Sequence, residues 1–441
     1  MATGRAPKRP RSRRTSLGDP DSTLVRMNHT SVGARPPFSP ELRRRRTAIF
    51  VFMLVVGVSM ASWVVRTPAV RDLLDASTGQ MGLVLFGLSV GSMTGVLSSA
   101  SVVRAHGARR TIAIGGASLV VGLALVGIAS SLGLTAGVFV GLALVGGGVG
   151  MSEIAINIEG ADIENSSGRS VLPMLHGCYS LGTVVGASVG IGLTAADFPV
   201  VWHLTGIAAA GAAAALWAVP TVPATTGLAR KGTAASSTWR EQLSVWKQSR
   251  ILMLGLIVLA LALAEGSASD WLPLLMVDGH GMSETLGSVI FTGFAAAMTI
   301  GRFSGEPLLA RYGNVAVLRV SALVSAAGIA LVVFADNVVV AGCAVILWGL
   351  GAALGFPVTL SAAGDSDDPT SSVAAVATAG YVAFLVGPPL LGFLGEHYGL
   401  RGAMVVVLVV VALASLLTSA ARPRARSESE SSVTSVPTAL S

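Results

Sequence analysis

The sequence predicts an all-α membrane protein in which twelve transmembrane helices form two pseudo-symmetric six-helix bundles. Three observations carry this prediction: the composition, the long apolar stretches and the distribution of Lys and Arg. Hydrophobic residues make up 52% of the 441 residues and charged residues only 12%, and the mean hydropathy is +0.72. A soluble protein of this length needs many more charges to cover its surface. We therefore expect the chain to lie in a lipid bilayer.

Twelve apolar stretches are each long enough to cross the bilayer as a helix, which takes about 20 residues. The stretches are unbroken and lack the alternation of barrel strands, so helices are expected rather than a membrane barrel. In chain order, the predicted spans are roughly 47–66, 80–103, 111–130, 134–158, 171–193, 200–219, 251–276, 285–304, 316–335, 337–360, 372–394 and 402–420.

The Lys and Arg residues predict the orientation of these spans. If the N-terminus lies inside, 27 of the 30 Lys and Arg residues fall on the inner side, and only Arg66, Arg71 and Arg401 fall outside. An excess of Lys and Arg marks cytoplasmic loops, and a missed span would destroy this asymmetry. We expect a multi-pass protein of a bacterial-type inner membrane with both termini in the cytoplasm.

Three polar segments flank and divide the spans. Residues 1–46 hold 12 Lys and Arg and lack the apolar region of a signal peptide. A disordered cytoplasmic tail attracted to anionic lipid is expected there, and a nucleic-acid patch is the alternative. Residues 220–250 are expected to form a cytoplasmic linker between the bundles 47–219 and 251–420, and residues 421–441 a second cytoplasmic tail.

An internal repeat supports the organisation in two bundles. The segment GVLSSASVVRAHG (95–107) follows the second span, and GRFSGEPLLARYG (301–313) follows the eighth. Each runs from a Gly through eleven residues to another Gly, with an Arg near its end. Two similar six-helix halves are the signature of transporters whose halves rock about a site near the membrane midplane.

Polar residues in the fourth and fifth spans are candidates for binding a solute and coupling its movement to protons. Glu153 either faces a cavity, because the preceding glycines allow close helix packing, or lies at the inner membrane interface. Asn157 follows one turn later on the same face. His176 and Tyr179 begin the fifth span, and the imidazole either titrates near neutral pH or is satisfied by loop groups.

The stretch LALAEGSASDW (261–271) puts two acidic residues into the seventh span, where a charge costs a few kcal/mol or more. Glu265 lies about 21 Å from the inner end of this helix, within the apolar core, and is a candidate for proton or substrate binding. Asp270 lies about 28 Å along and, with Trp271, is expected at a helix end or gate. Five residues of separation put the two carboxylates on different faces unless Gly266 breaks the helix.

The end of the first span supplies two more candidates. Arg66 either snorkels to the outer interface or serves as a buried countercharge or substrate ligand. Trp63 either stacks on the face of a sugar or belongs to the aromatic belt at the membrane interface.

Other patterns in the apolar spans predict packing rather than chemistry. Gly182, Gly186 and Gly190 recur every four residues and predict a face for close helix packing. Cys178 and Cys343 lie in apolar runs without the spacing of a disulfide or metal site. The sequence shows no nucleotide-binding loop and no nucleophile triad. We therefore expect no enzyme activity, no catalytic residues, no cofactor and no metal.

The loop RAHGARR after the second span resembles the cytoplasmic signature of the major facilitator superfamily, and the resemblance covers about residues 47–420. In that signature an acidic residue, a Gly and basic residues form a gate contact. The resemblance implies gating roles for Arg104, Gly107, Arg109 and Arg110. The Asp that the family carries before the Arg is missing here.

Acidic partners for this gate are found at two places in the sequence. Glu306 follows Arg302 in the second copy of the repeat, and both are candidate gating residues. At the end of the fourth span, Glu159, Asp162 and Glu164 either meet the Arg cluster or are solvated.

Within the superfamily, SEIAINIEGADIENSSGRSVLPMLHGCYSLG (152–182) resembles the fucose–proton symporters. The shared pattern is E-x-A-x-N, then S-S-G, then S-x-G. In those relatives the Glu of this pattern is implicated in substrate binding and proton coupling, which implies the same role for Glu153. They also carry an Asp four residues before a Pro in the first helix, and that position is Val64 here. A bacterial branch typified by MosC is similar at ASWVVRTPAVRD (61–72), AEGSASDW (264–271) and GPPLLGFL (387–394).

The candidate residues and the resemblance together predict a secondary active transporter that works by alternating access. We expect it to move a small polar solute, sugar- or cyclitol-like, with proton coupling. A drug or metabolite efflux antiporter of the same fold is the alternative, and a non-transporting membrane sensor is a further one. The expected partners are the solute, protons and the lipid bilayer, with no nucleic acid, and the family default is a monomer.

Overall fold

The computed structural model describes residue 1 and residues 39–167, 171–228, 245–366 and 368–422. Contacts divide the chain into two units, Met1–Ser39 and Pro40–Ser441, and the helices lie in the second. Most of the predicted N-terminal tail, linker and C-terminal tail lies outside the described residues.

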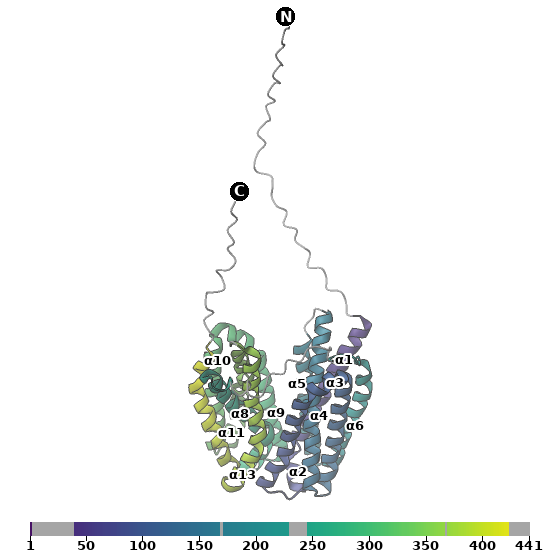
Figure 1. Ribbon diagram of the computed structural model, residues 1–441. Coiled ribbons are helices and arrows are strands. Elements are labelled where there is room, and N and C mark those ends of the chain that lie inside the picture. Colours follow the sequence, from purple (N-terminus) through teal and green to yellow (C-terminus); the bar gives the residue numbers. More distant parts are fainter. Residues whose placement is uncertain (2–38, 168–170, 229–244, 367, 423–441) are drawn as a thin grey trace, which may run out of the picture. The chain divides into compact units, whose positions relative to one another are not determined.

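The described residues of the second unit are helical, and no strand occurs among them. The helices that precede the linker are α1 (Pro40–Val64), α2 (Thr67–Leu73), α3 (Thr78–Ser131), α4 (Thr135–Ser167), α5 (Leu172–Ala195), α6 (Val200–Ala218) and the 3₁₀ helix η1 (Val219–Thr221). The helices that follow it are α8 (Ser249–His280), α9 (Glu284–Phe303), α10 (Gly305–Phe334), α11 (Val338–Ala352), α12 (Gly355–Gly364), α13 (Pro369–Leu417) and the 3₁₀ helix η2 (Thr418–Ala421). Figure 1 shows α1 to α6 on one side of this unit and the later helices on the other.

Ten helices of the described part are long and apolar enough to cross a membrane. Two of them are far longer than one crossing needs: α3 has 54 residues and α13 has 49. The predicted all-helical class is confirmed for the described residues. The number of twelve spans and the division into two six-helix bundles stay predictions.

Three glycines interrupt the long helices with one shared backbone geometry. Gly107 in α3 has φ 83° and ψ 161°, Gly313 in α10 has φ 74° and ψ 165°, and Gly399 in α13 has φ 71° and ψ 160°. This region of backbone space is essentially restricted to glycine. Gly107 and Gly313 end the two copies of the sequence repeat, so the repeat corresponds to the same turn in both parts of the chain.

One predicted span is interrupted near a proline, and another ends near one. The span 337–360 breaks at Ala353–Leu354, where α11 ends and α12 begins. Pro357 has no N–H to donate to the carbonyl of Ala353 four residues earlier, which weakens the helix at that point. In the same way α1 gives way to α2 two residues before Pro68.

Glycines bring the backbones of α1 and α5 into direct contact. A Cβ atom added to Gly182 would lie 2.1 Å from the carbonyl oxygen of Leu54, and one added to Gly186 would lie 2.5 Å from that of Val58. One turn later, a Cβ on Gly190 would collide with Val65. The predicted packing face of the fifth span is therefore confirmed. Successive glycines of α5 contact successive turns of the chain from Leu54 to Val65.

Candidate functional site

A cavity of about 1200 Å³ lies between the helices on either side of the linker. It is large enough for a sugar-sized or drug-sized ligand. The side chains that line it mix polar and charged groups with aromatic rings. They include Glu153, His176, Tyr179 and Ser180 from the first part of the chain, and Glu265, Thr299, Arg302, Phe303, Asn314, Phe356, Ser361, Tyr381 and Phe384 from the second.

Glu153 is the acidic group on the α4 side of this cavity. Close glycine packing sets the path of α4 just before it: a Cβ on Gly146 would lie 2.1 Å from the carbonyl oxygen of Leu88 in α3. The Glu153 carboxylate lies near enough to His176 and Tyr381 for electrostatic interaction. Among the described residues, no Lys, Arg or His lies within ion-pair distance of it. The cavity therefore holds an acidic group that is available to a ligand or a proton.

Glu265 pairs with Arg302 across the cavity wall formed by α8 and α9. The Nη2 atom of Arg302 lies 2.7 Å from Oε1 of Glu265. The Glu265 side chain is 15% exposed and that of Arg302 is 47% exposed, so the cation faces the open space more than the carboxylate does. Both residues were predicted from the sequence, Glu265 for coupling and Arg302 for a gate, but their ion pair was not.

The helix that carries Glu265 is unbroken through the following residues. α8 continues past Gly266 to His280, and Ser267 donates its hydroxyl to the carbonyl of Leu263 four residues back at 2.5 Å. Asp270 therefore stays on a different face of α8 and is absent from the cavity lining. Its neighbour Trp271 is fully buried. The gating roles of these two residues stay predictions.

Two tyrosines line the cavity together with the acidic groups. Tyr179 interacts electrostatically with Glu153 and with both members of the Glu265–Arg302 pair. Tyr381 from α13 lines the same cavity and was not among the predicted residues. The signal was present, because the chain has only four Tyr residues and Tyr381 is a phenol inside a predicted apolar span.

Three of the residues predicted to bind the solute or couple protons lie outside the cavity lining. Arg66 is 3% exposed and donates a hydrogen bond from Nε to Nδ1 of His203 at 3.0 Å, so it does not snorkel to solvent. Trp63 is 1% exposed in the core. Asn157 has a buried Oδ1 without a hydrogen-bond partner in the described part of the chain.

The ends of the helices opposite Pro40 are held together by contacts between the two parts of the chain. Arg71 in α2 pairs with Asp278 in α8. Burial disfavours the charge of Arg71, but hydrogen bonds with Asp278 and Asp72 outweigh this and raise the pKa of the guanidinium. The N–H of Gly79 donates to the Glu396 carboxylate at 2.8 Å.

Two further contacts tighten the same end. Ser288 in α9 donates its hydroxyl to the carbonyl of Val65 at 3.2 Å. A Cβ on Gly392 of α13 would lie 2.6 Å from the Cα of Gly82 in α3, so the two backbones touch. The cavity lining reaches the opposite end of the helices, at Asn314 and Ser361. The cavity is thus closed at one end and lies toward the end where α1 begins.

At that other end, the acidic residues of α4 meet a different partner from the predicted one. Arg45 of α1 lies 2.7 Å from Glu159 and 2.6 Å from Asp162. Glu164 accepts hydrogen bonds from the N–H groups of Val171 and Leu172 at the start of α5. The acidic cluster is therefore occupied within the first part of the chain, which argues against its pairing with the Arg cluster of the loop.

That loop turns at Gly107 and packs against the segment after η1. The N–H of Ala108 donates to the carbonyl of Thr226 at 2.8 Å. Arg104 is exposed and donates to the hydroxyl of Ser101. Arg110 is also exposed and Arg109 is half-buried. The side chain of Glu306 lies outside the described part, and the gating roles of all these residues stay predictions.

Removing Arg45 is expected to destabilise the protein strongly. The Glu159 side chain is fully buried, and Arg45→Ala would leave its carboxylate without a countercharge, which costs about 3 kcal/mol of unfolding free energy. Thermal unfolding in detergent measures the effect. The matched control is Asp162→Asn, because that side chain is 48% exposed and its loss should cost less than about 1 kcal/mol. Equal stability of the two variants would contradict the assignment.

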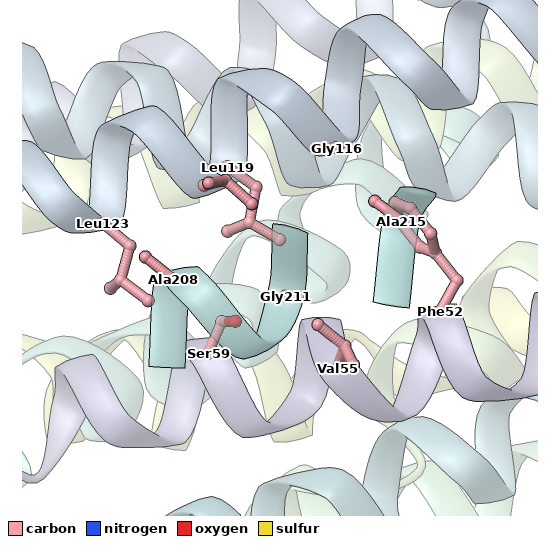
Figure 2. Close-up of a pocket in the computed structure, with 10 residues that line it drawn as sticks. Phe52, Val55, Ser59, Gly116, Leu119, Leu123, Ala208, Gly211 and Ala215 are labelled. Atoms are coloured by element: carbon pink, nitrogen blue, oxygen red, sulfur yellow. The ribbon is translucent and has the colours of Figure 1, made fainter. Parts of the chain in front are cut away.

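A second void, shown in Figure 2, is too small and too apolar for a ligand. It measures about 10 Å³ and lies between α1, α3 and α6, with Phe52, Val55, Leu119 and Leu123 among its lining residues. A space of this size is about that of one water molecule, which would need polar partners. We interpret it as a packing gap.

Comparison with known proteins supports the predicted resemblance. The family model of the Major Facilitator Superfamily matches residues 171–376. An uncharacterized MFS-type transporter of Yersinia pestis is 28% identical over 374 residues, which covers 84% of this chain and 93% of that protein. The membrane protein MosC of Rhizobium meliloti is 24% identical over 379 residues, covering 84% of this chain and 89% of MosC.

Solved structures share the fold. A mutant of the nucleoside transporter NupG superposes with a TM-score of 0.72 at 14% identity, over 86% of this chain and 99% of that one. A mutant of the E. coli fucose:proton symporter FucP superposes with a TM-score of 0.59 at 18% identity, over 86% of this chain and 98% of that one. At such identities the likeness concerns the fold alone. The resemblance predicted from the sequence motifs is confirmed.

Proposed function

We propose that this chain is a member of the major facilitator superfamily, which its family-model match, its relatives and its fold support. It is a secondary active transporter that moves a small polar solute together with protons by alternating access. One observation carries this proposal: the cavity between the two parts of the chain gathers two acidic groups, an Arg, a His and two Tyr residues in an otherwise apolar protein.

The proposed membrane arrangement has twelve crossings in two six-helix bundles, 47–219 and 251–420. The 54 residues of α3 and the 49 residues of α13 each suffice for two crossings of about 20 residues, with the turns at Gly107 and Gly399 between them. Added to the other eight candidate spans, this makes twelve. The Lys and Arg bias then puts both termini in the cytoplasm of an inner membrane.

The proposed coupling group is Glu265. As a carboxylate it holds Arg302 at 2.7 Å, and a proton on Glu265 would neutralise the carboxylate and free the guanidinium, which keeps its positive charge. A free Arg302 would bind an acceptor oxygen of the solute. Protonation and solute binding are thereby linked through one ion pair.

The proposed solute ligands are the remaining polar groups of the cavity. Glu153 accepts hydrogen bonds from hydroxyl groups, and His176 and Tyr179 supply further polar contacts on the same wall. Asn157, one turn from Glu153, would support that part of α4 from outside the lining. Aromatic rings, Tyr381 and Phe384 among them, offer flat apolar surfaces for the faces of a sugar or cyclitol ring.

One observation favours a second candidate, an efflux antiporter for drugs or metabolites. Phe303, Phe356 and Phe384 all line the cavity, beside several aliphatic residues, and such a surface suits amphiphilic cations. The two candidate functions require ligands of different chemistry, so a binding measurement distinguishes them.

A thermal-shift screen is expected to identify the ligand class. Purified protein is heated with sugars, cyclitols, nucleosides and amphiphilic cations, and a ligand at about 100 times its Kd stabilises the protein by about 2.7 kcal/mol. We expect a polyhydroxylated compound to raise Tm, and Glu153→Gln to remove the shift. Gly206→Ala is the control, because Gly206 has open space around it. Shifts from amphiphilic cations alone would favour the antiporter.

A further inference from the structure

Four buried polar atoms without partners gather at the end of α1, away from the solute cavity. They are Ser62 Oγ, Arg66 Nη2, Thr194 Oγ1 and His203 Nε2, and none has a hydrogen-bond partner in the described part of the chain. Their residues are between 0% and 8% exposed. Buried polar groups in folded proteins are nearly always bonded, so a group of four orphans indicates a missing acceptor or donor.

The four atoms come from three helices and the turn after α1, at one level. Ser62 lies near the end of α1, Arg66 lies four residues later in the turn between α1 and α2, and Arg66 contacts His203 of α6. The Cε1 atom of His203 lies 3.5 Å from a Cβ placed on Gly190 of α5. Thr194 follows Gly190 by one turn on the same face of α5. Cε1, the ring atom bonded to Nε2, therefore lies beside α5, one turn from Thr194.

The hydrogen bond between Arg66 and His203 fixes the chemistry of the imidazole. Arg66 Nε donates to Nδ1, so Nδ1 is the acceptor and Nε2 carries the hydrogen. Arg66 Nη2 and His203 Nε2 are both donors, and the hydroxyls of Ser62 and Thr194 can donate as well. The cluster thus presents several donors and lacks an acceptor.

The cluster also carries a buried positive charge. The guanidinium of Arg66 stays protonated, and a buried charge without a paired countercharge is costly. Glu284 at the start of α9 attracts it electrostatically, but no ion pair within 4.0 Å joins them in the described part of the chain. A set of hydrogen-bond donors around the unpaired Arg66 cation is suited to bind an anion.

We propose that Arg66, His203, Thr194 and Ser62 form a binding site for a small inorganic anion, which we take to be chloride. This site is separate from the solute cavity. The helices pack closely beside these groups, since a Cβ on Gly190 would lie 2.2 Å from Val65 and 3.5 Å from Cε1 of His203, and a monatomic ion is therefore the ligand that we propose. The site lies directly beside the Val65 carbonyl that accepts from Ser288, where the two parts of the chain meet. A bound anion neutralises the cation at that contact and stabilises the closed end.

Halide titration of the purified protein tests this proposal. At constant ionic strength, replacing sodium gluconate by sodium chloride or bromide is expected to raise Tm saturably. Arg66→Gln should abolish the response, and Thr194→Val, which removes only the hydroxyl, should weaken the apparent halide affinity about tenfold. Arg401→Gln is the matched control, because this Arg at the same end bonds Asp336 and backbone carbonyls and should leave the response unchanged.

A crystal grown in bromide gives a direct readout on the unaltered protein, which keeps the proposal testable if Arg66→Gln does not fold. An anomalous bromide peak within hydrogen-bond reach of Arg66 and His203 is expected. Water alone at the site, the Glu284 carboxylate bound to Arg66, or a Tm response that is the same for gluconate and chloride would each overturn it.

Discussion

Glu265→Gln is expected to abolish the accumulation of solute that a pH gradient drives in proteoliposomes. A Gln amide has no carboxylate to take up a proton and cannot form the 2.7 Å ion pair with Arg302, so solute binding loses its link to protonation. The lost charge-assisted bond is worth about 1.5–3 kcal/mol, so Arg302 stays free at every pH and the accumulation ratio should fall to the level seen without a gradient. Uptake of the ligand from the thermal-shift screen, measured under an imposed pH gradient, gives the result.

Two comparisons separate lost coupling from a lost fold. Exchange of labelled for unlabelled solute without a gradient should continue in Glu265→Gln, because exchange needs no net proton movement. Glu265→Asp keeps a titratable group and should retain partial accumulation. Accumulation at the unaltered level in Glu265→Gln would contradict the assignment of Glu265 as the coupling group.

Gly392→Leu is expected to stop transport by keeping the closed end of the helices apart. A Cβ at this position would lie 2.6 Å from the Cα of Gly82, and backbone cannot move aside as a side chain can. α3 and α13 would have to separate, so the transporter would not reach the state with this end shut. Uptake should fall to background, whereas ligand binding in the thermal-shift assay persists.

Opening of the closed end in Gly392→Leu can be detected by labelling a cysteine that is buried when this end is shut. In a background with Cys178→Ser and Cys343→Ser, a Ser288→Cys substitution puts a thiol at a fully buried position of the closed end. Adding Gly392→Leu should raise its reaction rate with a membrane-impermeant maleimide. Gly206→Leu is the control, because no atom lies within 4 Å of its added Cβ. Slow labelling together with normal uptake in Gly392→Leu would contradict the closed-end account.

The helix positions were largely predictable because crossing a bilayer imposes a length and an apolar composition. The predicted span 285–304 corresponds to α9 at Glu284–Phe303, and 171–193 corresponds to α5 at Leu172–Ala195. The break at Leu354 was not predicted, because hydropathy does not register a missing N–H. Pro357 was the available signal.

The candidate site was predictable only residue by residue. The cost of charge in a bilayer singled out Glu265, and the resemblance to the fucose–proton symporters implied Glu153; both line the cavity. Their partners depend on tertiary packing that spacing along the chain does not encode. Arg302 lies 37 residues from Glu265 on a different helix. Arg66 was equally compatible with a snorkelled and a buried position until its contact with His203 was known.

The central claim is that the solute binds in the cavity between Glu153 and the Glu265–Arg302 pair. A structure of the protein with the compound found in the thermal-shift screen tests it most directly. The account predicts ligand density within hydrogen-bond distance of Glu153 or Arg302, with a ring against Tyr381 or Phe384. Ligand density elsewhere in the protein, with this cavity free of it, would contradict the claim.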